Sequence, residues 1–223
     1  MMKATALDSP PSDPLALARE AVFSPIGSQG LVEQAVRRLG EAIGLGLLEV
    51  GERLPPESEL ARQLDIATMT LRQALAILRQ AGYLETRRGR GGGTFVRQAV
   101  PPAPPRRARS ALRRLSEADL RDLVGFRQLV AGASAVLAAE RASDAEIAEL
   151  EALVRRMAEP PPFAEFRRLD SRFHLAIASA AASPRLATAE RSIQSELNEL
   201  LALIPHPPEA LRLSNAQHQA ITE

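Results

Sequence analysis

The sequence predicts a mainly α protein in two parts, an N-terminal winged helix-turn-helix with a small β-hairpin and a C-terminal all-α helical bundle. Only 3% of the 223 residues are aromatic and none is Trp, so aliphatic side chains must form the core, which favours helices. Apolar residues recur at helical spacing along most of the chain. Four prolines within residues 101–105 cannot continue a helix, and they separate the two parts.

These patterns divide the chain into four segments. Residues 1–22, which contain Pro, Ser and Asp, are expected to be a mobile arm, and residues 23–98 the winged helix-turn-helix. Residues 99–111 read as a Pro- and Arg-rich linker, and residues 112–223 as the helical domain. No apolar run near the N-terminus suits a signal peptide or a membrane span, so we expect a cytoplasmic protein with no membrane partner. The absence of cysteine excludes disulfides, thiolate zinc sites and cysteine nucleophiles.

Three helices and one hairpin are predicted in the N-terminal domain. Pro at the first turn begins the second helix, and Gly82 ends the third. A basic, glycine-rich turn at residues 87–93 joins two short strands. In chain order, the predicted elements are helices over 31–43, 57–64 and 68–81, and strands over 83–86 and 94–97.

The C-terminal domain shows helical patterns only. Sequences of capping-box form at Ser116 and Ser143 predict where its first two helices begin. The last pattern continues to the end of the sequence, so we expect this domain to lack its last helix. The predicted helices cover 117–141, 144–158, 163–182, 184–204 and 209–221.

The third predicted helix has the features of a DNA-recognition helix. Its apolar stripe faces inward, which leaves polar side chains to enter a major groove about 12 Å wide. These candidates for DNA contact are Thr68, Met69, Thr70, Arg72 and Gln73. In the hairpin turn, Arg88 and Arg90 suit a narrow minor groove, and the small Gly91 lets the backbone approach the duplex. The alternative is a solvated helix face and a loop without a ligand.

Three motifs of the N-terminal domain are distinctive: Leu-Pro-Pro-Glu-Ser-Glu-Leu-Ala at 54–61, Thr-Leu-Arg-Gln-Ala-Leu at 70–75, and the glycine-containing motifs from Gly82 to Val96. Through these motifs, residues 31–97 resemble the GntR family of bacterial transcription regulators. The resemblance implies a homodimer on a palindromic double-stranded DNA operator, with contacts from Ser58, Thr68, Thr70, Arg72 and Gly91. Where the family commonly has Ser or Thr followed by Arg, this chain has Ala67-Thr68, which alters the operator sequence to be expected.

Asp170 and His174 are a candidate metal pair in the second domain. They are four residues apart, so both side chains project from one face of a helix, although this spacing is also typical of a capping or ion pair.

The helical domain also resembles that of the FadR-like branch of GntR regulators, through residues 169–174 and 218–221. The resemblance implies that Asp170, His174 and His218 are three of four ligands to a divalent metal ion, zinc in first place, with nickel or manganese as alternatives. The fourth, a histidine on a further helix, is not in this sequence. A three-ligand site is more open to solvent or to a small carboxylate.

Arg127 is the candidate effector residue. Family members often carry an acidic residue four positions after the matching arginine, and this chain has Ala131 there. Arg127 is therefore free to pair with an anionic effector, although it can equally be a helix-surface residue.

Together these features predict a ligand-responsive, DNA-binding transcription regulator, with repression as the commoner outcome, whose helical domain binds a metal ion and a small organic acid. One alternative is a DNA-binding protein whose helical domain only dimerises. A remote alternative is a metal-dependent hydrolase that uses Asp170 and His174. We expect no enzyme, because the chain has no P-loop, serine elbow or dinucleotide fingerprint, and no general base is placed beside the pair.

Overall fold

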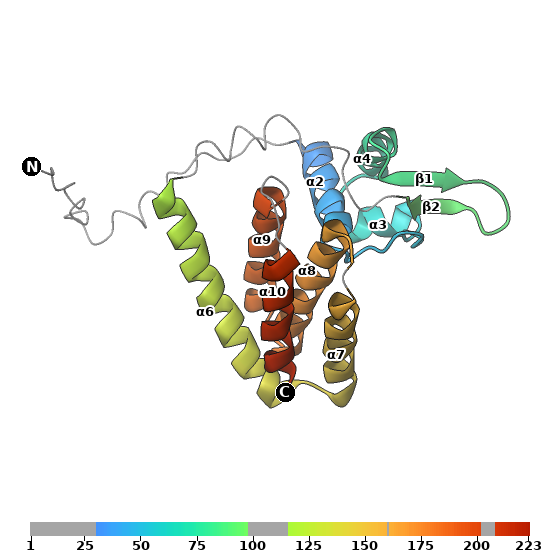
Figure 1. Ribbon diagram of the computed structural model, residues 1–223. Helices are drawn as coiled ribbons and strands as arrows, with labels where there is room; N and C mark the ends of the chain where they lie inside the picture. The colour runs from blue at the N-terminus through green and yellow to red at the C-terminus, as the bar shows by residue number, and fades with distance from the viewer. Residues whose placement is uncertain (1–29, 98–115, 160, 202–207) are drawn as a thin grey trace, which may run out of the picture. The chain divides into compact units, whose positions relative to one another are not determined.

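The computed structural model describes residues 30–97, 116–159, 161–201 and 208–223 (Figure 1). Residues Leu31–Glu223 belong to one structural unit. The expected arm at 1–22 and the expected linker at 99–111 lie outside the described residues. The division into two domains and its boundaries therefore stay predictions.

Within residues 30–97 the structure has three helices and a two-stranded antiparallel sheet, as predicted (Figure 1). Both α2 and α3 contact α4. In the sheet, Leu84 lies opposite Val96 and Arg87 opposite Gly93. The bounds are α2 Leu31–Gly44, α3 Glu57–Gln63, α4 Thr68–Gln80, β1 Leu84–Arg87 and β2 Gly93–Val96.

The apolar stripe of α4 determines how these elements pack. Leu71, Leu75 and Leu78 are almost completely buried and pack in one cluster with apolar residues of α2, α3 and the sheet. Gly82 ends the helix with a positive φ of 84°, which allows the Tyr83 N–H to donate to the Leu78 carbonyl oxygen at 2.9 Å. The opposite face of α4 is left for solvent or a ligand.

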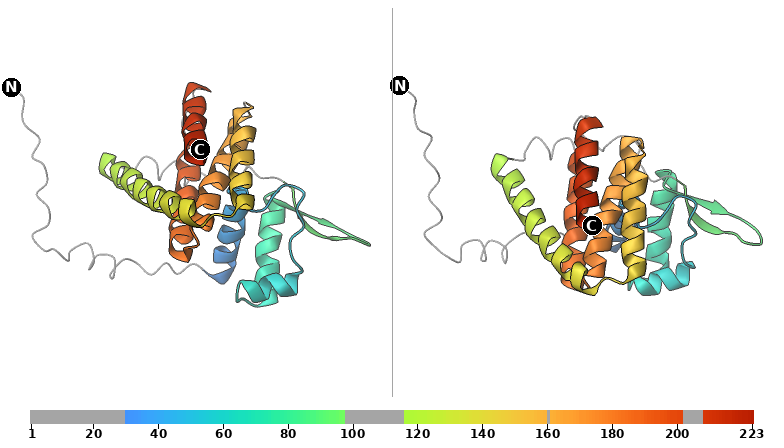
Figure 2. Two further views of the ribbon diagram at one scale, coloured as in Figure 1. Left: turned by 90° about the horizontal axis from the view of Figure 1, so that it is seen from below. Right: turned by 60° about the horizontal axis from the view of Figure 1, so that its bottom comes forward.

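Among the described residues from 116 onward, five helices form the C-terminal part of the structure (Figures 1 and 2). The capping boxes predicted at Ser116 and Ser143 are both present, with Asp119 and Glu146 as the reciprocal acceptors. Helix α8 contacts α6, α7 and α9, and α10 contacts α7. The bounds are α6 Glu117–Arg141, α7 Asp144–Ala158, α8 Phe163–Ala180, α9 Pro184–Leu201 and α10 Pro208–Thr222.

Helix α6 is long and apolar, and most of its surface is exposed. By length and composition alone it is long and apolar enough to cross a membrane, and 17% of its most apolar 18 residues is buried. Mostly buried core helices of soluble proteins and signal sequences share this length and composition. This helix also contacts α8 and α9.

Helix α8 places polar side chains inside the bundle. Its apolar residues Leu169, Phe173 and Ile177 pack in the main cluster with residues of α7. Its polar residues Arg167 and Asp170 are buried as well, and they contact buried polar residues of α9 and α10. The complete buried polar set among the described residues is Ser134, Arg167, Asp170, Ser171, His174, Glu190, Gln194 and His218.

Candidate functional site

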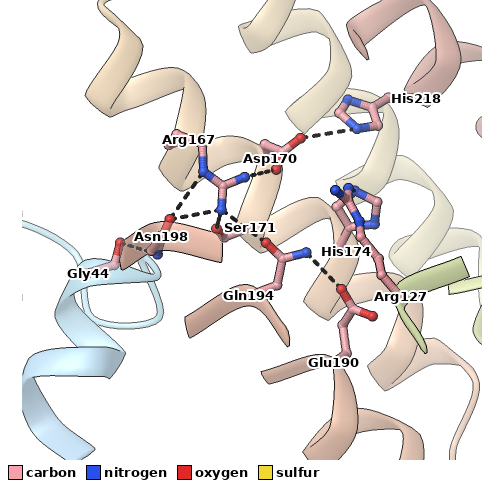
Figure 3. A network of polar contacts seen from close by, with 10 residues as sticks. All are labelled: Gly44, Arg127, Arg167, Asp170, Ser171, His174, Glu190, Gln194, Asn198 and His218. Atoms are coloured by element: carbon pink, nitrogen blue, oxygen red, sulfur yellow. Dashed lines mark hydrogen bonds and ion pairs between the residues drawn. The ribbon is translucent and has the colours of Figure 1, made fainter. Parts of the chain in front are cut away.

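Asp170, His174 and His218 come together inside the bundle (Figure 3). Asp170 and His174 lie one turn apart on α8, and His218 reaches them from α10. One potential ligand atom from each lies within 4.8 Å of the others, and all three residues are buried. The structure therefore unites the three residues that the family resemblance implied.

The Asp170 carboxylate is held in its charged form. Burial alone would raise its pKa, but a hydrogen bond from His218 and the positive charge of Arg167 outweigh burial and lower the pKa to about 2. The His218 Nε2 atom lies 3.3 Å from Asp170 Oδ1. Asp170 is therefore an anion at any physiological pH.

His174 is neutral at pH 7 and is contacted by Arg127. Burial, helped by the positive charge of Arg127, lowers the pKa of His174 to about 4, although Asp170 acts in the opposite direction. Arg127 Nη2 lies 3.0 Å from His174 Nε2. Because arginine can only donate, Nε2 must be the ring nitrogen with the free lone pair. Arg127, from α6, is therefore at the cluster rather than on an outer surface of its helix.

A buried arginine that the sequence analysis missed, Arg167, contacts Asp170 on the side away from His218 (Figure 3). Arg167 Nη1 donates to Asp170 Oδ2, and its Nη2 donates to Ser171 Oγ at 3.2 Å and to Gln194 Oε1 at 3.2 Å. It also donates to Asn198 Oδ1 at 2.8 Å. Arg167 thus ties the carboxylate of Asp170 to polar residues of α9.

The network extends from Arg167 in two directions (Figure 3). Gln194 Nε2 donates to Glu190 Oε1 at 2.8 Å, while Glu190 Oε2 is buried without a hydrogen-bond partner among the described residues. Burial raises the pKa of Glu190, against the effect of Gln194 and Arg127. In the other direction, Asn198 Nδ2 donates to the carbonyl oxygen of Gly44 at 3.5 Å, at the end of α2.

The cluster fits a divalent cation by its donors. One carboxylate and two imidazoles suit zinc, nickel or manganese, and Asp170 and His174 are already in the protonation states that ligation needs. In the neutral tautomer of His218 that donates from Nε2, the other nitrogen carries a lone pair. This Nδ1 is buried and has no hydrogen-bond partner among the described residues.

The side chains predicted to contact DNA are distributed over α3, α4 and the hairpin turn. Thr68 and Thr70 are half-buried, and the others are exposed: Ser58, Met69, Arg72, Gln73, Arg88, Arg90 and Gly91. The Arg72 Nε atom donates to Glu57 Oε2 at 2.7 Å, a pair that the sequence analysis did not anticipate. The arginine is thereby held at the start of the recognition helix.

The hairpin turn at residues 87–93, which we call the wing, depends on its glycines and on one arginine for its conformation. Gly89 and Gly91 have φ values of 92° and 87°, which favour glycine. A Cβ atom on Gly92 would lie 2.5 Å from the Arg87 carbonyl oxygen, so this position also has no room for a side chain. The Arg87 guanidinium lies 4.3 Å from the centre of the Phe95 ring and braces the two strands.

Two family models match the chain. The model described as bacterial regulatory proteins, gntR family, matches residues 31–96, and the FCD domain matches residues 122–223.

Several curated proteins are similar to the chain. RmpR, a helix-turn-helix regulator of Mycobacterium gastri, is 45% identical over 72% of this chain and 58% of its own length. An uncharacterised regulator of Mycobacterium tuberculosis is 33% identical over 57% of this chain and 53% of its own length. The chain thus spans rather more than half of these two relatives. An Escherichia coli protein named as the L-lactate dehydrogenase operon regulatory protein is 30% identical over 86% of this chain and 76% of its own length.

The matched domains and relatives are those of transcription regulators and not of enzymes, which removes the hydrolase alternative. The recognition helix, the wing and the buried polar cluster all lie within the matched segments. The chain therefore belongs to the GntR family of bacterial transcription regulators and carries an FCD domain.

Proposed function

We propose that this chain is a cytoplasmic, homodimeric transcription regulator that represses its operator and whose helical domain takes up a divalent metal ion with a small organic acid. The observation that carries the proposal is the convergence of Asp170, His174 and His218 inside an FCD domain. Three potential ligands within 4.8 Å of one another, all buried, are difficult to explain by surface solvation.

The DNA-reading surface follows from the exposed face of α4 and from the wing. Arg72 is suited to a guanine or a phosphate and Gln73 to an adenine in the major groove. The arginines of the wing are suited to the minor groove beside it. The proposed contacts are Ser58, Thr68, Met69, Thr70, Arg72, Gln73, Arg88, Arg90 and Gly91, on each half of a palindromic operator.

Asp170, His174 and His218 would hold the metal ion. When bound, such an ion supplies positive charge and open coordination positions for a carboxylate. Arg127 lies beside His174, and its guanidinium would pair with the carboxylate of the bound organic acid. The single turn of α8 between Asp170 and His174, braced by Arg167, keeps two of the donors in fixed positions.

A helical domain that only dimerises is the second candidate, and one observation favours it. The polar groups already partner one another, since His218 contacts Asp170 at 3.3 Å and Arg127 contacts His174 at 3.0 Å. A purely structural role would need nothing more than these contacts.

Metal content separates the two candidates. We expect elemental analysis of the purified chain to find about one equivalent of metal per chain, which His174→Ala removes and Gln217→Ala, at an exposed position of α10, retains. Circular dichroism of the variants checks that both are folded. A parent chain without metal after incubation with zinc, nickel or manganese would contradict the metal site and favour the helical domain that only dimerises.

A further inference from the structure

The outer face of α6 is apolar and exposed. Leu129 is 74% exposed and Val136 62%, while Val130 and Ser134 on the opposite face are buried in the helical domain. Gly125, Leu129, Gly132 and Val136 follow one another at spacings of four, three and four residues, so they share one face of the helix. No charged residue lies between residues 128 and 139. Such a continuous apolar face on a soluble domain marks an interaction surface.

Two glycines on this face have no explanation among the described residues of one chain. Glycine in the middle of a helix is destabilising relative to alanine. A Cβ atom on Gly125 or Gly132 would meet nothing within 4 Å, so no neighbouring group of the described chain requires glycine there. Small residues between larger apolar ones allow a second helix to approach closely.

We propose that the partner on this face is a second copy of the same chain, with the two α6 helices packed antiparallel about a two-fold axis near Gly132. A two-fold interface requires that residue i contact j while j contacts i. This face meets the requirement, because Gly132 then lies against its own copy and Leu129 of each chain lies against Val136 of the other. The inference rests on the dimer of the proposed function and assigns its surface.

The dimensions of the face fit a protein partner better than a bilayer. The uncharged stretch at 128–139 is 12 residues long, whereas a bilayer needs about 20 apolar residues. Within this stretch, Ser134 is buried on the opposite side of the helix. Arg127, which directly precedes the stretch, contacts His174 inside the bundle. The whole helix of 25 residues is about 37 Å long, so the same helix of a second copy can lie along it over most of its length.

A single introduced cysteine tests the two-fold axis directly, because the chain has no cysteine of its own. Gly132→Cys adds its side chain to open space, so the fold of one chain tolerates it. Under mild oxidation we expect most of this variant to form a disulfide-linked dimer on a non-reducing gel. Leu213→Cys on α10, where Leu213 is 64% exposed, is the matched control and should remain mostly uncrosslinked. Equal crosslinking of both variants would overturn the proposed axis.

The molar mass in solution gives a second, independent test. We expect light scattering to find twice 24.1 kDa for the parent and for Leu213→Lys, and the mass of a single chain for Leu129→Lys and Gly132→Leu. Gly132→Leu should keep its helix content and its bound metal, which separates loss of the interface from loss of the fold or of the metal site.

Three results would overturn the inference. If all the variants remain dimeric, the dimer stands but its interface lies elsewhere. If the parent is monomeric, both the interface and the proposed dimer fail. If the monomeric parent floats with anionic phospholipid vesicles and Leu129→Lys does not, the partner of this face is a membrane.

Discussion

The winged helix-turn-helix and the helical domain bury different kinds of side chain. Among the described residues, 30–97 bury apolar side chains and no polar or charged ones, whereas the helical part buries eight polar or charged residues. In the winged helix-turn-helix, the proposed contact residues lie at the surface of a core that packs without them. In the helical domain, the proposed ligands are part of the core itself.

This difference predicts which residues can be substituted to change function without changing the free energy of unfolding. A recognition residue such as Gln73 can be changed at little cost to folding, because water already solvates it. Asp170 or Arg167 cannot, since removal of either leaves buried polar partners unsatisfied. The following predictions test this contrast.

The largest effect is expected from Arg167→Met. The change removes every hydrogen bond that Arg167 gives to Asp170, Gln194 and Asn198, and it leaves a buried carboxylate without its cation. Breaking a buried pair from one side typically costs about 3–5 kcal/mol. Urea unfolding should therefore show a fall in the free energy of unfolding of this size.

The control for Arg167→Met is Arg155→Met on α7, which loses only the exposed ion pair with Glu151. This change should cost at most about 1 kcal/mol. Equal losses for the two variants would show that the interior of the helical domain does not depend on its polar network.

Acid should lower the free energy of unfolding, because buried groups of the helical domain titrate. With a chelator present, the native pKa of His174 is about 4 and the unfolded value about 6.5, so between these values the unfolded state binds more protons. Stability should therefore fall as the pH drops from about 6.5 to 4, by on the order of 3 kcal/mol. Below about pH 4, protonation of Asp170, whose native pKa is about 2, continues the fall.

Unfolding free energies measured in urea at pH 7, 5.5 and 4.5 check this expectation. A His174→Gln variant should lose the part of the pH dependence between 6.5 and 4. If the slopes of parent and variant agree, His174 is not the group that titrates.

A smaller effect, confined to DNA binding, is expected from Gln73→Ala. Loss of one base contact typically weakens specific binding by about 1–3 kcal/mol, or roughly 5- to 150-fold. Fluorescence anisotropy with operator DNA measures this loss, while the free energy of unfolding should change by less than about 0.5 kcal/mol. Gln80→Ala at the end of the same helix is the matched control. Equal operator affinity for Gln73→Ala and the parent would remove Gln73 from the contact surface.

The smallest effect is expected from Glu57→Gln. It removes the surface ion pair with Arg72, whose side chain is 59% exposed, so the free energy of unfolding should fall by about 0–1 kcal/mol. The same urea titration as for Arg167→Met allows direct comparison. A loss as large as that of Arg167→Met would erase the contrast between surface and interior.

The sequence predicted local structure well, because local chemistry determines it. Ser116 and Ser143 each accept a hydrogen bond from a backbone N–H three residues later, and these partners are readable from spacing. Gly82 likewise identifies the end of α4. The grouping of Asp170 with His174 was predicted from their spacing of one helical turn, and His218 was added only through the family resemblance.

The polar partners of the cluster were not predictable in the same way. Glu190, Gln194 and Asn198 are four residues apart on α9, and their polarity gave no sign that they face inward. The Arg127–His174 contact joins residues 47 positions apart, and the Arg72–Glu57 pair joins residues 15 apart. Such contacts depend on how helices pack, and hydrophobic periodicity specifies the packed face but not the pairs across it.

The hydrogen bond from Asn198 to the end of α2 links the buried cluster to the DNA-reading part of the chain. Linkage between two binding sites is reciprocal: if a ligand at the cluster changes operator affinity by some factor, the operator changes the affinity for that ligand by the same factor. Operator DNA would then act as an effector of metal binding. A metal titration with and without DNA would measure how much the operator changes metal affinity. The difference in this change between the parent and Asn198→Ala would give the contribution of the Asn198 side-chain amide.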